Sequence, residues 1–218
     1  MPLARNYRRD EAMGSGPIGA ACKRALDIIG SLSGLLILSP VVLAVAIAVR
    51  LSLGKPVLYC QQRAGLNGHP FTLFKFRTML VSRSTGIDPA TDAARLTGLG
   101  TILRNASLDE LPQLWNVLKG EMSLVGPRPL LLEYLPYYTA RQSKRHSMKP
   151  GITGLAQIKG RNAVTWKRKF LWDVWYVEHW SISLDLWILL ATIAKVIKRE
   201  GISQHGHITT EKFGAEGK

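Results

Sequence analysis

The sequence predicts an α+β protein: a mainly helical monotopic membrane protein with an N-terminal re-entrant helix, a small sheet and interfacial amphipathic helices. Three observations support this fold class. An uncharged segment covers residues 28–49, an aromatic-rich strand pattern covers 71–79, and tryptophans stand close to basic residues between 134 and 187. A chain of 218 residues suits one domain with a sizeable core, or one domain plus an appendage.

The chain is strongly basic, with 29 Lys and Arg against 15 Asp and Glu, and a net charge of +14. Such an excess suits an anionic partner, which is a nucleic acid, an acidic lipid or a phosphorylated metabolite. The two cysteines, Cys22 and Cys60, flank an apolar segment and do not have the pattern of a disulfide framework. We therefore expect a reducing compartment.

Residues 28–49 exceed the roughly 20 residues that a helix needs to cross a bilayer. Basic residues flank both ends, so the positive-inside rule favours keeping both ends on the cytoplasmic face. Ser39-Pro40 interrupts the segment, and a proline bends a helix because it lacks a backbone donor. We expect a helix that enters the membrane, turns at Ser39 and Pro40, and returns to the same face. A kinked spanning helix is the alternative.

The strand pattern at 71–79 has period-two geometry, which places Lys75 and Arg77 on one face. Two cations on one face predict an anion site, whereas a solvated edge is the alternative. Further along, glycine-containing turns at 149–155 and 160–162 bracket a short predicted strand at 156–159.

Two adjacent carboxylates, Asp109 and Glu110, stand where a helix should start. Ser107 and Glu110 have the pattern of a capping box, so a purely structural role is one reading. Pro112 fits a helix whose N-cap is Asp109 better than one whose N-cap is Ser107. In either register the helix dipole keeps both carboxylates ionised, as a nucleophile or a metal ligand must be.

Pro127-Arg128-Pro129 fixes the backbone on both sides of one arginine, whose guanidinium can pair bidentately with phosphate. Arg104 lies about one helical turn before the carboxylate pair. Neither a Walker A loop, nor a Gly-x-Gly-x-x-Gly fingerprint, nor a nucleophile elbow is present. The residues thus indicate a membrane-surface protein with a metal-capable carboxylate pair and several cations suited to phosphate.

From Tyr134 to Trp172 there is no acidic residue, and five of the six tryptophans lie between 166 and 187. Aromatic rings beside Lys and Arg are typical of a membrane interface. A nucleic-acid surface is the alternative, but the chain has no helix-turn-helix, zinc-finger or RNA-recognition signature. The last helix is expected at 184–199, with Ser183 as its N-cap and Asp185 in its first turn.

At these motifs the chain resembles the bacterial sugar transferases, the monotopic phosphoglycosyl transferases that begin lipid-linked glycan assembly. The resemblance runs in order over roughly residues 20–200. It rests on Lys-Arg-Ala-Leu-Asp at 23–27, Ser-Pro at 39–40, Gln-Arg-Ala-Gly at 62–65, Lys-Phe-Arg-Thr-Met at 75–79, Ser-Leu-Asp-Glu-Leu-Pro-Gln at 107–113, Val-Gly-Pro-Arg-Pro at 125–129, Lys-Pro-Gly-Ile-Thr-Gly at 149–154 and Asp-Val-Trp-Tyr-Val at 173–177.

The resemblance implies transfer of a sugar 1-phosphate from a UDP-sugar to polyprenyl (undecaprenyl) phosphate, with release of UMP. It also implies that Asp109 is the nucleophile, forming a covalent phosphosugar intermediate, and that Asp109 and Glu110 hold Mg²⁺. Arg128 would bind phosphate. The residues Lys75, Arg77, Arg104 and Arg161 are further candidates for binding the diphosphate, the uridine or the lipid phosphate.

The resemblance also implies that the break at Ser39-Pro40 makes the membrane helix re-entrant, so we expect the protein at the bacterial inner membrane with its catalytic domain on the cytoplasmic face. The expected organisation is a basic segment at 1–22, the re-entrant helix at 23–50, the catalytic domain at 51–200 and a flexible tail at 201–218. The expected partners are a UDP-sugar, polyprenyl phosphate and the anionic cytoplasmic leaflet, with no nucleic acid. A homodimer is left open.

Cys60 and Thr101 depart from residues that are frequent in the family, which bears on the lipid-phosphate and sugar contacts rather than on the reaction class. One rival interpretation is a membrane-bound glycosyltransferase that releases UDP. Another is a non-enzymatic protein that binds membrane or nucleic acid, in which Asp109 and Glu110 only cap a helix. The sequence does not identify the sugar, and a lid at 82–95 has a plain surface loop as its alternative.

Overall fold

The computed structural model describes residues 16–81, 95–160, 165–198 and Phe213. The mainly helical α+β architecture that the sequence predicts is confirmed for these residues. Most of the predicted N-terminal segment and tail lies outside them. The helices and strands are α1 (Gly16–Ile37), α2 (Ser39–Leu53), β1 (Leu58–Ala64), β2 (Pro70–Phe76), α4 (Gly98–Asn105), α5 (Gln113–Lys119), β3 (Ser123–Val125), α6 (Ala140–Ser143), β4 (Gly151–Thr153), α7 (Leu155–Gly160), α8 (Trp166–Glu178) and α9 (Ile182–Lys198), with short 3₁₀ turns η1 (Leu66–Gly68), η2 (Leu108–Glu110), η3 (Leu132–Tyr137) and η4 (Lys144–Ser147).

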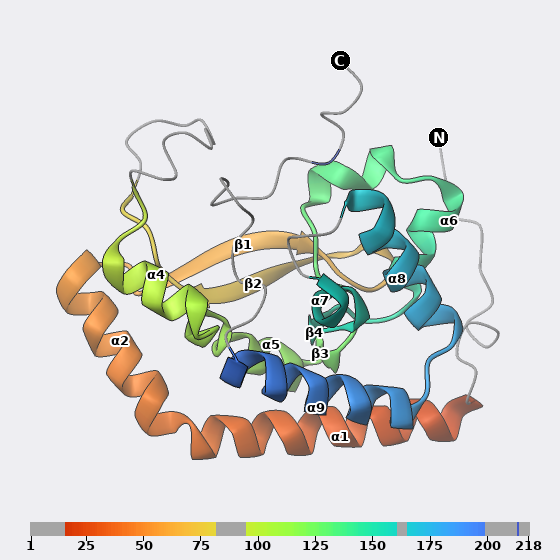
Figure 1. Ribbon diagram of the computed structural model, residues 1–218, viewed down its shortest axis with the longest axis horizontal. Helices are drawn as coiled ribbons and strands as arrows, with labels where there is room; N and C mark the ends of the chain where they lie inside the picture. The colour runs from red at the N-terminus through yellow and green to blue at the C-terminus, as the bar shows by residue number, and fades with distance from the viewer. Residues whose placement is uncertain (1–15, 82–94, 161–164, 199–212, 214–218) are drawn as a thin grey trace.

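α1 and α2 form a bent pair with an angle of 62° between them; in Figure 1, α1 runs along the lower edge of the molecule and α2 rises along its left side. Pro40 lies in the first turn of α2, and the Ser39 hydroxyl donates to the carbonyl of Leu36 at 2.8 Å. The predicted break at Ser39-Pro40 is therefore confirmed. In the part of the chain that the structure describes, each helix alone is too short or too polar to cross a membrane; only the bent pair together meets that length and composition.

Most of the large apolar side chains that are exposed among the described residues lie on α1, α2 and α9. α9 lies beside α1 (Figure 1), and the two are in contact. The uncovered side chains of α1, α2 and α9 are Ile18, Leu26, Ile28, Ile29, Leu32, Leu36, Ile37, Val41, Leu43, Ile47, Leu51, Leu186, Trp187, Leu190 and Ile193. An apolar surface of this extent marks an interaction site for a membrane or another protein.

The described strands form two small sheets. β1 and β2 make an antiparallel hairpin, and β3 pairs in parallel with β4, with Ser123 opposite Gly151. The predicted strand at 71–79 is confirmed as far as Phe76. The predicted strand at 156–159 is wrong, because these residues belong to helix α7. The strand in this part of the chain is β4, which begins earlier, at Gly151. A Cβ atom on Gly151 would lie only 2.0 Å from the backbone nitrogen of Gly126. The glycine permits close strand pairing rather than a turn.

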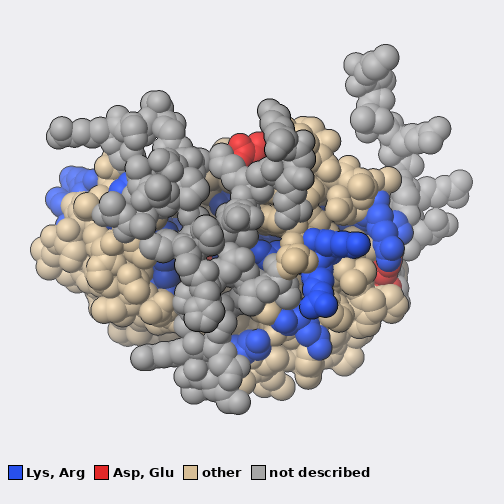
Figure 2. All heavy atoms as spheres, turned by 45° about the horizontal axis from the view of Figure 1, so that its top comes forward, with Lys and Arg blue, Asp and Glu red and all other residues tan. Residues whose placement is uncertain are grey.

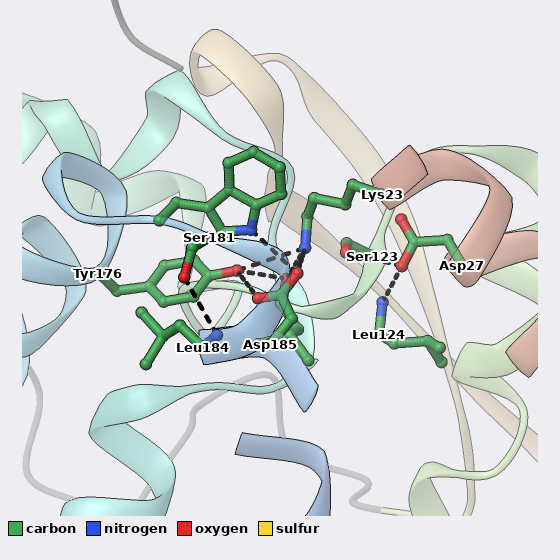
Figure 3. A network of polar contacts seen from close by, with 10 residues as sticks. Lys23, Asp27, Ser123, Leu124, Tyr176, Ser181, Leu184 and Asp185 are labelled. Atoms are coloured by element: carbon green, nitrogen blue, oxygen red, sulfur yellow. Dashed lines mark hydrogen bonds and ion pairs between the residues drawn. The ribbon is translucent and has the colours of Figure 1, made fainter. Parts of the chain in front are cut away.

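A buried polar network ties α1 to the C-terminal helices (Figure 3). Lys23 forms an ion pair with Asp185 at 2.6 Å, and Asp185 also accepts from the Tyr176 hydroxyl and the Trp180 indole. Asp185 thus serves as a buried anchor rather than a surface charge near a helix end. Trp180 belongs to the core, so it is not one of the interface tryptophans that the sequence predicts.

The cap of α9 also differs from the prediction. Ser181, and not Ser183, caps the helix, since its hydroxyl accepts from the backbone N–H of Leu184 at 3.2 Å. The helix consequently begins two residues earlier than expected, at Ile182. Both cysteines are free, which agrees with the predicted lack of a disulfide framework, and both side chains are exposed.

Candidate active site

Asp109 and Glu110 lie in η2, the 3₁₀ turn between α4 and α5. Ser107 precedes it in the left-handed region with a φ of 55°, and its side chain makes no capping hydrogen bond. The predicted capping box is therefore not formed, and α5 begins only after Pro112. A turn of three residues has little macrodipole, so neighbouring charges and burial decide the ionisation of these carboxyl groups.

Glu110 is held by two cations from distant parts of the chain. Its Oε1 accepts from Lys75 Nζ at 2.9 Å and from Arg128 Nη2 at 2.8 Å. Burial by itself would raise the pKa of Glu110, but the charges of Lys75 and Arg128 outweigh it and hold the pKa well below its usual range. Glu110 is therefore an anion held in place by one cation from β2 and one from the turn that follows β3.

Asp109 has a different environment. Its side chain is buried, and none of the ion pairs and hydrogen bonds among the described residues involves its carboxylate. Burial, followed by the adjacent charge of Glu110, raises the pKa of Asp109 to about 6, against the opposing charges of Lys75, Arg104 and Arg128. At neutral pH the carboxylate is mainly ionised, and among the described residues it has no hydrogen-bond partner to displace, which suits a nucleophile.

Hydrogen bonds to two main-chain carbonyls hold the Pro127-Arg128-Pro129 turn, one carbonyl before the turn and one within it. Before it, the carbonyl of Val125 accepts from Lys23 Nζ at 2.9 Å and from the Tyr176 hydroxyl at 3.2 Å. Within it, the carbonyl of Arg128 accepts from Arg145 Nη2 at 2.6 Å. These contacts fix the backbone from which the Arg128 guanidinium reaches Glu110.

Arg145 is itself fixed by a buried ion pair with Asp173 on α8, at 2.7 Å. The sequence predicts no role in the site for either residue, nor for Lys23 and Tyr176 as supports of the turn. Lys23, Asp173 and Tyr176 do lie in the segments 23–27 and 173–177 that carry the family resemblance, so these motifs were the signal that could have identified them. A charged residue such as Arg145 is rarely buried unless it is paired.

The other predicted cations are placed differently. Arg104 on α4 donates from Nε to the Thr78 hydroxyl at 3.1 Å, and its charge reaches Asp109. Arg77 follows the end of β2 and does not join the dyad. Its guanidinium donates to the carbonyls of Leu53, Gly54 and Lys55, at the C-terminal end of α2. Arg161 and nearly all of the predicted lid at 82–95 lie outside the described residues.

Asp109 and Glu110 are a small donor set for a metal ion. Over the described ranges 16–81, 95–160 and 165–198, the acidic, His and Cys side chains do not gather in threes around a common point. Among the described residues, Glu110 forms its two ion pairs through Oε1, and the Asp109 carboxylate forms no ion pair. Mg²⁺ is commonly held by one or two carboxylates with water and substrate phosphates, so the pair fits this ion in the presence of a phosphorylated ligand.

Comparisons with known proteins cover nearly the whole chain. The model of the family described as bacterial sugar transferase matches residues 18–199. A protein of Bacillus subtilis named as an uncharacterized sugar transferase, EpsL, is 52% identical over 195 residues, which are 89% of this chain and 96% of that protein. The undecaprenyl-phosphate glucose phosphotransferase of Komagataeibacter xylinus is 43% identical over 194 residues, or 80% of this chain and 36% of that protein. The UDP-galactose-lipid carrier transferase of Erwinia amylovora is 39% identical over 196 residues, or 82% of this chain and 41% of that protein.

Proposed function

This chain belongs to the bacterial sugar transferase family, and from that premise we propose that it transfers a sugar 1-phosphate from a UDP-sugar to polyprenyl (undecaprenyl) phosphate, releasing UMP. The names of the Komagataeibacter and Erwinia relatives support the lipid acceptor and the UDP-sugar donor. These two relatives are more than twice as long as the matched segment, so their substrates support the proposal by similarity over that segment alone.

The observation that carries the proposal is the contrast within the dyad. Glu110 is fixed between Lys75 and Arg128, while the Asp109 carboxylate beside it has no hydrogen-bonded partner among the described residues. An ionised carboxylate that has no hydrogen bond or ion pair among the described residues, beside cations that can hold a diphosphate, is suited to attack phosphorus. A glycosyltransferase that releases UDP would need no such nucleophile.

In the first step, an oxygen of the Asp109 carboxylate forms a bond to the β-phosphorus of the UDP-sugar. The bond between that phosphorus and the bridging oxygen breaks, and UMP leaves with the bond electrons. In the second step, a phosphate oxygen of the polyprenyl phosphate attacks the same phosphorus and displaces Asp109, so that a polyprenyl diphosphate sugar forms and the carboxylate is restored.

Other residues of the chain would hold the diphosphate during this reaction. The Arg128 guanidinium, on its fixed turn, presents donors to a phosphate oxygen, and Lys75 and Arg104 add positive charge around the reacting phosphorus. Asp109 and Glu110 would hold Mg²⁺, which supplies charge that offsets the diphosphate and assists departure of UMP.

The protein would act at the cytoplasmic face of the bacterial inner membrane. The bent pair α1–α2 would enter the bilayer and return at Ser39-Pro40, and the uncovered apolar side chains of α1, α2 and α9 would lie in lipid. Lys and Arg side chains gather on the face shown in Figure 2, where few acidic side chains are in view. In this arrangement a soluble nucleotide sugar and a lipid phosphate meet at one site.

The test measures nucleotide release by the purified protein in nanodiscs that contain undecaprenyl phosphate and Mg²⁺, with a panel of UDP-sugars. We expect UMP from the wild type with at least one donor, and a loss of at least a thousandfold in Asp109→Asn, because an amide is a poor nucleophile. Intact mass should show one phosphosugar on the wild type before acceptor is added. Release of UDP, or UMP release that persists in Asp109→Asn, would exclude the proposed mechanism.

A further inference from the structure

Phe213 lies beyond the part of the chain that the family model matches, which ends at residue 199. Its ring nevertheless contacts four aromatic rings of the family domain. The distances between ring centroids are 5.8 Å to Tyr134, 5.6 Å to Tyr138, 5.6 Å to Trp166 and 4.8 Å to Phe170. Separations of this size are those of favourable aromatic pairs, which contribute beyond the apolar area that they bury. The chain is therefore anchored on the domain at Phe213.

The four rings that receive Phe213 form an aromatic cluster from two parts of the chain. Tyr134 belongs to η3 and Tyr138 directly follows it, whereas Trp166 and Phe170 lie one turn apart on α8. Tyr134 meets Trp166 edge to face at 5.8 Å, and Tyr138 meets Phe170 edge to face at 5.4 Å. Because Phe213 contacts all four rings, it adds a further link between η3 and α8.

Arg145, which supports the Arg128 turn, lies against the same cluster. The carbon of its guanidinium is 6.0 Å from the centroid of the Tyr138 ring and 5.7 Å from that of Phe170, within the range of cation–π contacts. Its Nη2 donates to the carbonyl of Arg128 at 2.6 Å. Contacts therefore run without a break from Phe213, through two rings, to the guanidinium that holds the Arg128 turn.

We propose that Phe213 is a positioning residue for the reaction: it closes the aromatic cluster over Arg145 and so holds the Arg128 turn in place. This role rests on the proposed function, in which Arg128 binds a phosphate group of the substrate. Rings that are packed on several sides have less freedom to move, and they restrict the guanidinium that lies against them. A phosphate-binding arginine on a restrained backbone loses less entropy when the substrate binds.

The first readout is proteolysis in nanodiscs, which needs no substrate. Trypsin cleaves after lysine, and Lys212 directly precedes Phe213. Cleavage at this bond follows the population in which the anchor has opened, so we expect it to be about tenfold faster in Phe213→Ala and in Trp166→Ala than in the wild type. Intact mass identifies the product. Phe213→Tyr keeps a ring and should match the wild type, as should Tyr137→Ala, which removes an exposed ring from η3.

The second readout is single-turnover release of UMP without acceptor, at saturating UDP-sugar and well below the melting temperature. We expect Phe213→Ala to slow this step by about threefold to tenfold, the range that the contacts of one aromatic ring provide. Phe213→Tyr and Tyr137→Ala should retain the wild-type rate. In an Arg145→Lys background the further effect of Phe213→Ala should be small, because both changes loosen the same turn. Tyr138→Leu, which removes one of the intervening rings, replaces that background if Arg145→Lys does not fold.

The outcomes separate the anchor, its role in the reaction and the proposed function. Equal cleavage of the wild type and Phe213→Ala refutes the anchor, whether or not the protein releases UMP. Faster cleavage with an unchanged rate of UMP release refutes the positioning role, as does a slower rate that merely parallels a lower melting temperature. Fully independent effects of Phe213→Ala and Arg145→Lys refute action through Arg145. Absence of UMP from the wild type contradicts the proposed function, while the trypsin result still decides on the anchor.

Discussion

Asp109 and Glu110 are neighbours in the chain, yet their surroundings move the pKa values of their carboxyl groups in opposite directions. Glu110 contacts two cations and stays ionised, whereas burial and the charge of Glu110 raise the pKa of Asp109 to about 6. A buried anion without a hydrogen-bonded partner is costly, so the two carboxyl groups differ in how readily they lose a proton. The sequence indicates both carboxylates as site residues, but it does not show this difference in their pKa values.

The raised pKa of Asp109 predicts the pH dependence of the first chemical step. The carboxylate must be deprotonated to attack, so single-turnover UMP release should fall as the pH drops through about 6 and level off above 7. Glu110→Gln removes a charge that raises this pKa and frees Lys75 and Arg128, so the midpoint should move to lower pH. Rapid-quench measurements between pH 5 and 8 test both statements, and a midpoint that Glu110→Gln shifts upward would contradict them.

Arg77, unlike Asp109 and Glu110, has a structural environment in which its guanidinium binds the protein main chain. Because its guanidinium binds three main-chain carbonyls after α2, we expect Arg77→Lys to destabilise the protein by roughly 1–3 kcal/mol while leaving the KM for the UDP-sugar unchanged. Thermal unfolding in detergent and initial rates measure the two effects. Lys75→Gln is the matched comparison and should act mainly on catalysis. If Arg77→Lys instead raises the KM without lowering stability, Arg77 binds substrate and the structural role proposed here is wrong.

At the scale of elements, the break between α1 and α2 has a local cause. Pro40 begins α2, and the Ser39 hydroxyl satisfies the carbonyl of Leu36. Short-range chemistry of this kind depends on adjacent residues, so the sequence could place the bend correctly. The orientation of the pair in a bilayer depends instead on the whole molecule.

Cys22 and Cys60 offer a direct test of the re-entrant arrangement, because both are exposed and lie on opposite sides of the bend. We expect a membrane-impermeant maleimide to label both in inverted inner-membrane vesicles and neither in intact spheroplasts. Cys22→Ser and Cys60→Ser assign each signal to its residue. Labelling of the two cysteines from opposite sides would establish a spanning helix and contradict the proposal.

The whole molecule is held together by contacts between residues far apart in the chain. Lys23 on α1 binds Asp185 on α9 and the carbonyl of Val125, so one buried ammonium joins α1 and α9 to the strand that precedes the Arg128 turn (Figure 3). A core cluster that includes Val125, Tyr176 and Ile188 lies around this network. The position of the Arg128 turn therefore depends on how α1 and α9 pack together.

Removal of one member of this buried pair should be more harmful than removal of both. Lys23→Met leaves the Asp185 charge without its cation and should destabilise the protein by about 3–5 kcal/mol, whereas Lys23→Met combined with Asp185→Leu should recover part of the loss. Melting temperatures in nanodiscs measure both. Equal stability of the single variant and the wild type would show that the network contributes little.

The sequence by itself determined the helical α+β class, the bend at Ser39-Pro40, the aromatic hairpin strand and the Asp109–Glu110 dyad with its nearby arginine. These features depend on composition, proline and periodicity, which act over a few residues. Only the tertiary structure decided that Lys75, and not Arg77, binds Glu110. It also decided that the dyad lies in the turn η2 instead of at a capped helix start, and that strand β4 begins at Gly151. Packing between distant segments sets burial, close backbone approach and charge pairing, and these also raise the pKa of Asp109 and hold Glu110 between Lys75 and Arg128.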